Sequence, residues 1–455
     1  MQIQSGFLVF LVFYTLITLV LLHAVYRTSQ LIVDEEFHLR QGEHFCRGRF
    51  HVWDPKITTF PGLYLISASL LGPFKACSVY ALRLTSAIAS IVNAYFIFII
   101  RRTVVGKQED ARVLLESISL AILPPLYFFS HLYYTDVLSV TMVLMMIYFS
   151  LKEKHNYGAL LAFFAIMMRQ TNIVWVGYIL GWRALDLAMK LCLPNENHQY
   201  RLRDLLTTVQ TLLGSRFMFV RVIKLIFSSY YGYILNILAF MAFLYWNGSI
   251  VVGDKSAHVA AIHLPQIFYF TLFFATFSGS ELLTLLPRVL RLVRNRWYIT
   301  AFGMALFAWI VQQNTIVHPY LLADNRHYTF YVWNRFFGRW WFARYLPVPI
   351  YYGIVVSLAF LLFAQHNGRP PLIVSSLVWI VATVASVALQ QLIEVRYFIL
   401  PFLVLRLVQP NVRPSRKLVA FEVAFNLTVN VVTFYIFFTK EFYWSDYREP
   451  QRLIW

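Results

Sequence analysis

Long apolar segments recur along the whole chain and are separated by short polar links. About 18–20 apolar residues suffice for a helix to cross the hydrocarbon core of a bilayer. The first segment covers residues 6–26, and because no small-residue cleavage site follows it, we expect a retained helix rather than a signal peptide. Further segments of this kind lie at residues 78–100, 113–130, 137–151, 157–168, 171–184, 225–246, 265–286, 297–313, 347–364, 372–391, 396–409 and 418–438. The pattern predicts one all-α polytopic membrane protein, a single domain over residues 1–455 with about 13 spans.

A polar stretch at residues 27–60 follows the first segment and carries too much charge to enter a bilayer. The next apolar run, residues 63–74, is too short to span and suits an interfacial or re-entrant helix. We therefore expect residues 27–77 to form one long loop. Several other apolar segments are also short, which indicates broken helices.

Composition supports the membrane assignment. Hydrophobic residues make up 59 % of the chain and charged residues 13 %, against roughly 25 % charged residues in an average soluble domain. This excludes a soluble enzyme, a disordered chain and a small secreted module. The net charge of +18 would suggest nucleic acid for a soluble protein, but in a membrane protein basic residues accumulate in cytoplasmic loops, so no nucleic-acid partner is expected.

The basic links set the expected orientation. They are residues 101–112, 183–224, 288–296 and 410–417, and all four share the cytoplasmic side only if a break near 169–172 divides 157–184 into two spans. The amino terminus is then cytoplasmic and the carboxyl terminus luminal. The luminal loops are residues 27–77, 131–136, 247–264, 314–346 and 390–396.

Two smaller features bear on this orientation. Cys46, Cys77 and Cys192 have no metal-ligand spacing, and a Cys46–Cys77 disulfide requires that both face an oxidising lumen, which the sequence does not decide. Asn247 begins a glycosylation sequon in an expected luminal loop, and the sequence does not establish whether it is modified.

The densest polar cluster lies just beyond the first span and contains Asp34, Glu35, Glu36 and His38. One carboxylate could act as a general base toward an acceptor hydroxyl. The carboxylates could instead bind a divalent cation, or form an ordinary solvated acidic loop. Their position at a membrane surface beside aromatic residues favours a functional role.

Four further clusters share the expected luminal face. Each has a structural alternative: a turn for the first, snorkelling at a helix end for the second, an interfacial loop for the third and an ion pair that orders a helix end for the fourth. Their polar residues are Trp53, Asp54 and Lys56; Arg169; Asp324, Asn325, Arg326 and His327; and Glu394 with Arg396.

A base candidate and several cations on one face suit group transfer from a membrane-anchored phosphate. The sequence has no Walker loop, no GxGxxG motif and no visible inverted repeat, so we do not expect a nucleotide-sugar enzyme. Arginines would stabilise the leaving phosphate while a carboxylate deprotonates the incoming hydroxyl.

Over nearly the whole chain, these motifs resemble those of the dolichyl-phosphate-glucose-dependent α-1,2-glucosyltransferases of the endoplasmic reticulum. The matching segments are 34–38 (DEEFH), 53–59 (WDPKITT), 61–64 (PGLY), 169–175 (RQTNIVW) and 322–328 (LADNRHY). The resemblance implies a GT-C fold with a luminal site. It also implies dolichyl phosphate β-glucose as donor, and the diglucosylated oligosaccharide on dolichyl diphosphate as acceptor. Because an α bond forms from a β donor, the reaction inverts configuration and needs one general base.

The resemblance also implies roles for individual residues. Asp34 is the first choice as base and Glu35 the second. The expected ligands of the donor phosphate are, in falling order, Arg396, Arg326, His327, Arg169 and Lys56. The expected substrate-binding residues are Glu36, His38, Trp53, Asp54, Asp324, Asn325 and Glu394, with no metal and no cofactor.

Two rival functions remain at this stage. A dolichyl-phosphate-mannose mannosyltransferase would have the same composition, and only the quoted motifs separate the two. A transporter or channel regulatory subunit should place its polar residues near mid-membrane in broken helices, whereas most of them here lie in loops on one side. The sequence carries no information on oligomeric state.

Overall fold

The computed structural model describes residues 2–106, 109–193, 200–255, 261–365, 372–409, 412–445 and 449–455. Every regular element in these ranges is a helix, and β pairing is limited to two isolated bridges, His327–Ile454 and Phe442–Gln451. A helix satisfies its backbone hydrogen bonds internally, which a lipid environment requires. The all-α prediction is therefore confirmed.

Several helices are suited to a bilayer. Four in the described part of the chain are long and apolar enough to cross one, namely α1 (Gln2–Thr28), α4 (Val79–Val105), α11 (Arg216–Asn247) and α20 (Arg416–Thr439). Shorter apolar helices include α7 (Thr135–Leu151), α8 (His155–Met168), α17 (Val348–Phe363) and α18 (Ile373–Val387). The protein is therefore a polytopic membrane protein.

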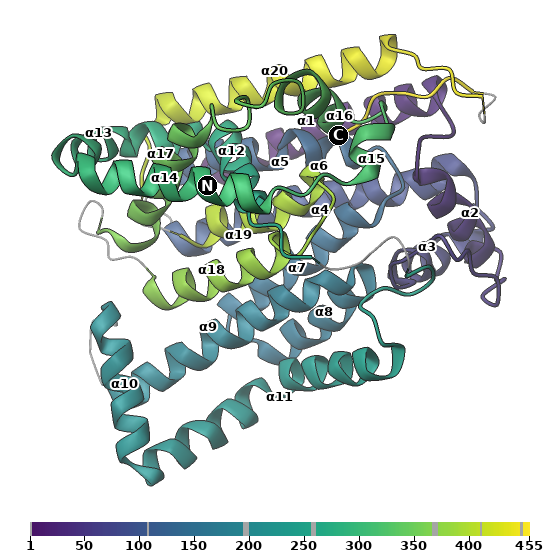
Figure 1. Ribbon diagram of the computed structural model, residues 1–455. Helices are drawn as coiled ribbons and strands as arrows, with labels where there is room; N and C mark the ends of the chain where they lie inside the picture. The colour runs from purple at the N-terminus through teal and green to yellow at the C-terminus, as the bar shows by residue number, and fades with distance from the viewer. Residues whose placement is uncertain are drawn as a thin grey trace.

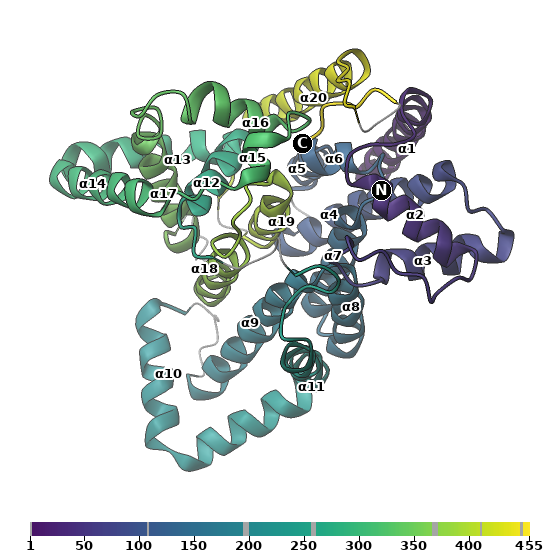
Figure 2. The same ribbon diagram turned by 45° about the vertical axis from the view of Figure 1, so that its right-hand side comes forward.

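The helices form one bundle around α4 and α7 (Figure 1). On one side α4 contacts α1 and α5 (Asp110–Ala121), and α20 covers α5. On the other side α7 contacts α8, while α9 (Ile173–Cys192) packs against both α11 and α18. Figure 2 shows the third group beside α19 (Ile399–Val408). This group consists of α17 with α12 (Pro265–Phe277), α13 (Gly279–Asn295) and α14 (Trp297–Asn314).

The predicted break near residue 169 is confirmed. Helix α8 ends at Met168, and Arg169 is extended with φ −148° and ψ 125°. A single turn, η3 (Gln170–Asn172), then leads into α9. The break therefore places Arg169 between two apolar helices, at the end of each.

One predicted span, residues 265–286, is sharply bent rather than a single straight helix. Helices α12 and α13 meet within it at a bend of 107°. Arg288, Arg291 and Arg294 recur every three residues on α13, so one face of this helix is basic. Such a helix suits the membrane surface rather than its interior.

The predicted loop 183–224 is also largely helical. Helix α9 continues to Cys192, α10 spans Leu202–Gly214, and α11 already begins at Arg216. These helices project from the bundle in Figures 1 and 2. Basic residues interrupt their apolar pattern, which is why a search for uninterrupted apolar runs misses them.

The polar loops gather at one end of the bundle. There α2 (Glu35–Cys46) packs on α3 (Gly62–Leu71), and α15 (Pro319–Ala323), α16 (Tyr328–Val332) and the carboxyl terminus lie nearby (Figure 1). Gly62 permits the contact of α3 with α8, because a Cβ there would overlap the carbonyl of Met167.

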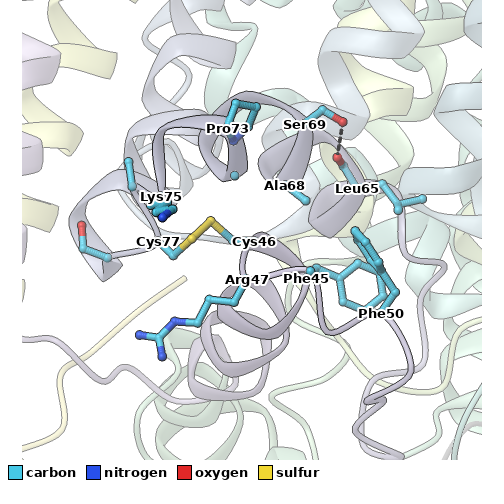
Figure 3. A pocket seen from close by; sticks show the side chains of 14 residues that line it. Phe45, Cys46, Arg47, Phe50, Leu65, Ala68, Ser69, Pro73, Lys75 and Cys77 are labelled. Atoms are coloured by element: carbon cyan, nitrogen blue, oxygen red, sulfur yellow. Dashed lines mark hydrogen bonds between the residues drawn. A yellow bond between two sulfur atoms is a disulfide. The ribbon is translucent and has the colours of Figure 1, made fainter.

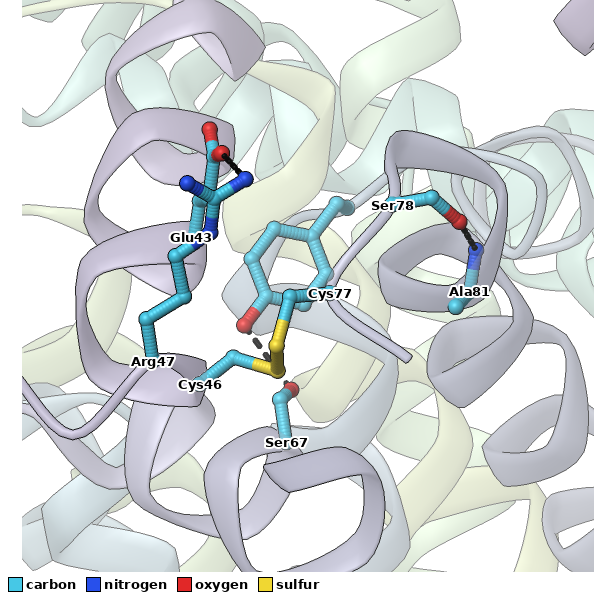
Figure 4. Close-up of a disulfide and its surroundings, with 8 residues drawn as sticks. Glu43, Cys46, Arg47, Ser67, Cys77, Ser78 and Ala81 are labelled. Carbon is cyan, nitrogen blue, oxygen red and sulfur yellow. Dashed lines mark hydrogen bonds and ion pairs between the residues drawn. A yellow bond between two sulfur atoms is a disulfide. The ribbon is translucent and has the colours of Figure 1, made fainter. Parts of the chain in front are cut away.

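A disulfide fastens the α2–α3 pair. The Cys46–Cys77 bond joins the end of α2 to the segment before α4 (Figure 4). An open recess of about 970 Å³ lies against this disulfide between α2 and α3 (Figure 3). None of the predicted site residues lines this recess.

Candidate active site

Asp34 lies at the amino-terminal end of α2, in a turn that a distant side chain, Gln451, contacts by a hydrogen bond. The preceding Val33 has a left-handed backbone (φ 39°), which a β-branched residue rarely adopts. Its N–H donates to Oε1 of Gln451 at 3.3 Å. The side chain of Asp34 is exposed and makes no capping hydrogen bond, so its carboxylate is not consumed by the helix that it starts.

Charged residues from two loops that are distant in sequence shift the pKa of Asp34. Burial raises the pKa of Asp34, and Glu394 raises it further, whereas the positive charges of Arg396, His327 and Arg326 lower it. The net direction is upward. Asp34 is exposed, but the protein around it partly desolvates its carboxylate. The structure therefore places the predicted base within electrostatic reach of three predicted phosphate ligands.

Glu35 occupies a different environment from Asp34. Its side chain is completely buried and forms an ion pair with Arg83 at 2.6 Å, with a second hydrogen bond from Arg83 Nε at 2.8 Å. The backbone N–H of Tyr133 donates to it at 2.6 Å. Both carboxylate oxygens are therefore occupied, and the pair anchors α2 to the bundle.

Asp136, at the start of α7, joins two of the predicted cations. Its carboxylate forms an ion pair with Arg169, and its other oxygen lies 3.6 Å from Arg396. Arg396 also pairs with Glu394 at 2.7 Å and lies 5.2 Å from the ring of Tyr134. This arrangement brings residues 169, 394 and 396 together, as the sequence predicted for one shared face.

A small cavity of about 30 Å³ opens beside these ion pairs. Its polar lining includes Asp136, Arg169, Asn172, Gln390 and Arg396, and apolar residues of α7, α9 and α19 complete it. A cavity of this size holds one or two atoms of a phosphate rather than a whole headgroup.

The second cationic group belongs to the loop between α15 and α16. Arg326 donates to both oxygens of Asp324, at 2.8 and 2.7 Å, and its guanidinium lies 4.2 Å above the ring of Trp444. His327 Nε2 lies 3.8 Å from the same carboxylate. Burial would raise the pKa of Asp324, but Arg326 and His327 outweigh it and hold that pKa below its ordinary value. Asn325 accepts a hydrogen bond from Trp444.

His38 lies inside this end of the bundle and is held in its neutral form. Its Nδ1 lies 2.6 Å from the hydroxyl of Tyr64, and its ring packs against Tyr134. Burial, together with the positive charge of Arg396, lowers the pKa of His38 to about 4. At neutral pH it can therefore accept or donate one hydrogen bond without adding charge.

The other predicted site residues lie farther out. Glu36 forms an ion pair with Arg40. Trp53 packs edge-on against Tyr64, and Asp54 accepts a hydrogen bond from the N–H of Lys56 at 2.9 Å. Lys56 is exposed, with its ammonium 4.8 Å from the ring of Phe37. Among the described residues, Lys56 takes no part in the ion pairs around Asp136 and Asp324, so its phosphate role stays a prediction.

Sequence reasoning missed Asp136, Trp444 and Gln451. Asp136 had a usable signal, because it is a carboxylate at the junction of an expected luminal loop and an apolar span. Trp444 and Gln451 had none, because their role depends on the carboxyl terminus folding back onto residues 326–328. In the described part of the chain, the exposed carboxylate of Asp34 lies within electrostatic reach of several guanidinium groups. Such an arrangement can accept a proton and stabilise an anion nearby.

Comparison with known proteins gives a consistent assignment. Residues 28–407 match the sequence profile of the DIE2/ALG10 family. A protein of Drosophila melanogaster is 42 % identical over 97 % of both chains, one of Mus musculus 38 % identical over 93 % of both, and one of Homo sapiens 34 % identical over 93 % of both. Each of these relatives is named Dol-P-Glc:Glc(2)Man(9)GlcNAc(2)-PP-Dol alpha-1,2-glucosyltransferase. No solved structure matches the chain. The chain belongs to the DIE2/ALG10 family.

Proposed function

We propose that this protein transfers glucose from dolichyl phosphate β-glucose to the diglucosylated oligosaccharide on dolichyl diphosphate. The transfer forms the terminal α-1,2 bond of the N-glycan precursor. The relatives that cover nearly the whole chain carry this activity in their names. The observation that carries the proposal is the exposed carboxylate of Asp34, which lies within electrostatic reach of Arg396, Arg326 and His327.

The reaction is a single displacement at C1 of the donor glucose. Asp34 takes the proton of the acceptor 2-hydroxyl as that oxygen attacks C1. The bond between C1 and the phosphate oxygen breaks, and its electron pair leaves with dolichyl phosphate. The attack comes from the face opposite the leaving group, so the β donor gives an α product, and no covalent glucosyl-enzyme is needed.

Asp34 is a better base than Glu35 for a geometric reason. A general base must reach the proton that it removes. Both oxygens of Glu35 are held by Arg83 and Tyr133 in a fully buried site, whereas Asp34 faces solvent. Its raised pKa also makes Asp34 a stronger proton acceptor than an ordinary aspartate, provided that it remains ionised.

Arginines from two directions stabilise the leaving phosphate. A guanidinium has five N–H donors, and the ion pairs of Arg396 with Glu394 and Asp136 leave some of these donors for a ligand. Arg326 is oriented by Asp324 in the same manner. Positive groups that are already oriented need little rearrangement when charge develops on the phosphate, which favours the transition state.

We further propose a GT-C architecture of about 13 spans in the endoplasmic reticulum membrane, with the site facing the lumen. Two observations support this orientation. The basic helix α13 lies away from the end that carries α2 and α3 (Figure 1), as a basic cytoplasmic segment should. The Cys46–Cys77 disulfide at the site end requires an oxidising compartment.

Purified protein in detergent or nanodiscs tests the function directly. We expect turnover of synthetic dolichyl phosphate glucose with a diglucosylated lipid-linked acceptor, and an α-1,2-glucosidic bond in the isolated product. Dolichyl phosphate mannose serves as the competing donor. Equal turnover with mannose would overturn the sugar assignment, and no transfer from the glucosyl donor would overturn the proposed function.

A further inference from the structure

The carboxyl-terminal segment, residues 449–455, is built into the site. It returns from α20 and pairs with the loop that carries Arg326, because the N–H of Ile454 donates to the carbonyl of Arg326 at 2.8 Å. The N–H of Tyr328 donates back to the carbonyl of Ile454 at 3.3 Å. The ring of Trp455 then packs against Tyr328. These residues therefore pack on the loop that carries Arg326.

Gln451 is the residue of this segment that contacts both Val33 and Arg326. Its residue is completely buried, and its backbone exchanges two hydrogen bonds with Phe442, at 2.9 and 2.8 Å. Its side-chain oxygen accepts from the N–H of Val33 at 3.3 Å and lies 3.4 Å from Nη1 of Arg326. Both partners are donors, so the amide oxygen, not its nitrogen, must face them.

This single oxygen connects the turn of the base with a cation that acts on it. Val33 directly precedes Asp34, and its left-handed backbone persists only if its surroundings hold it in place. Arg326 is one of the positive groups that lower the pKa of Asp34. The position of Asp34 relative to Arg326 therefore depends on a residue that touches neither the sugar nor the phosphate.

We propose that Gln451 is a positioning residue for the transfer reaction. It fixes the distance between the strained turn at Val33 and the guanidinium of Arg326. Asp34 can then reach the acceptor hydroxyl while Arg326 reaches the donor phosphate. This inference rests on the proposed function, because it assumes that Asp34 is the base. It assigns a reaction role to the carboxyl terminus, a segment outside the motifs that the sequence analysis singled out.

Two substitutions at this position separate positioning from packing. Gln451→Leu keeps a similar volume and removes the shared acceptor. Gln451→Glu retains an acceptor oxygen and adds a negative charge near Asp34. The matched control is Gln409→Leu, which replaces another buried glutamine, hydrogen-bonded to Ser376 at 2.8 Å.

The expected result for Gln451→Leu is a fall in kcat of about tenfold or more, with the KM for dolichyl phosphate glucose within about twofold. Gln451→Glu, measured at its own pH optimum, should keep kcat within about threefold of the wild type. The acid limb of its kcat/KM profile against pH should move to higher pH. The added negative charge should raise the pKa of Asp34, as the charge of Glu394 does. Gln409→Leu should change only the thermal midpoint.

Two outcomes would overturn the proposal. The first is a Gln451→Leu enzyme whose thermal midpoint falls as in Gln409→Leu while its kcat and pH profile match the wild type. The second is an unchanged acid limb in Gln451→Glu, which decides the matter even where Gln451→Leu does not fold. Failure of the wild-type enzyme to use the glucosyl donor would instead refute the proposed function, so the two failures are distinguishable.

Discussion

Three successive carboxylates at the start of α2 have three different environments. Successive residues of a helix point about 100° apart, so neighbours in sequence face different surroundings. Asp34 is exposed, Glu35 is buried against Arg83, and Glu36 pairs with Arg40. The sequence predicts that this cluster is functional. It cannot rank its members, because the ranking depends on Arg83, which lies 48 residues from Glu35 in the chain.

The neighbours of Asp34 should shift the pH dependence of the reaction in opposite directions. The base must be ionised, so activity is present above its pKa and is lost as the pH falls through it. Glu394→Gln removes a negative charge that raises this pKa, so the acid limb of kcat/KM should move to lower pH. Arg326→Gln removes a positive charge that lowers it, so the limb should move to higher pH. Shifts of the same sign in both variants would contradict this account.

His38 should make the protein sensitive to mild acid. Its pKa is about 4 in the folded protein against an ordinary 6.5, so the unfolded state binds the proton more readily. The stability that this neutral histidine contributes is therefore present above pH 6.5 and lost as the pH falls toward 4, by up to about 3 kcal/mol. We expect His38→Phe to flatten the dependence of the thermal midpoint on pH between 7 and 5. An unchanged slope would show that other groups cause it.

At the scale of elements, one of two helix breaks could be predicted from the sequence and the other could not. The break at Arg169 follows from charge parity between loops, and the structure has it. The bend between α12 and α13 was missed, because a window over 265–286 averages an apolar half with a basic amphipathic half. Apolar content identifies helices well but says little about where they turn.

The Cys46–Cys77 disulfide should stabilise the α2–α3 pair that carries Asp34. It closes a loop with a sequence separation of 31, for which chain entropy gives about 3–4 kcal/mol. We expect Cys46→Ser to lower the thermal midpoint and kcat together, because the start of α2 loses its anchor. Cys192→Ser is the control, since Cys192 is a free cysteine. Equal midpoints for both variants would contradict the stabilising role.

At the scale of the whole molecule, the proposed orientation places Cys192 on the cytoplasmic side and the disulfide in the lumen. In sealed microsomes, a membrane-impermeant maleimide should label the native Cys192 without detergent. In a Cys192→Ser background, a cysteine introduced by Lys255→Cys in the exposed 247–255 loop should be labelled only after permeabilisation. The reverse pattern would place the site on the cytosolic side.

The arrangement of the whole molecule determines how much of the site could be predicted from the sequence. Residues 34, 326, 327 and 396 are each identifiable as polar groups beside apolar spans, and the fold brings them within electrostatic reach of one another. Asp136 and Gln451 complete the arrangement through contacts between elements that are far apart in the chain. A single sequence indicates which residues are costly to place at a membrane, but not which of them meet.

The central claim is that the Asp34 carboxylate removes the acceptor proton, and the turnover of Asp34→Asn tests it most directly. The substitution keeps the volume and removes the proton acceptor, so kcat should fall by about a thousandfold or more while the thermal midpoint stays near the wild type. Glu43→Gln, on the same helix and paired with Arg47 at the surface, should remain fully active. An Asp34→Asn enzyme within tenfold of wild-type kcat would contradict the account.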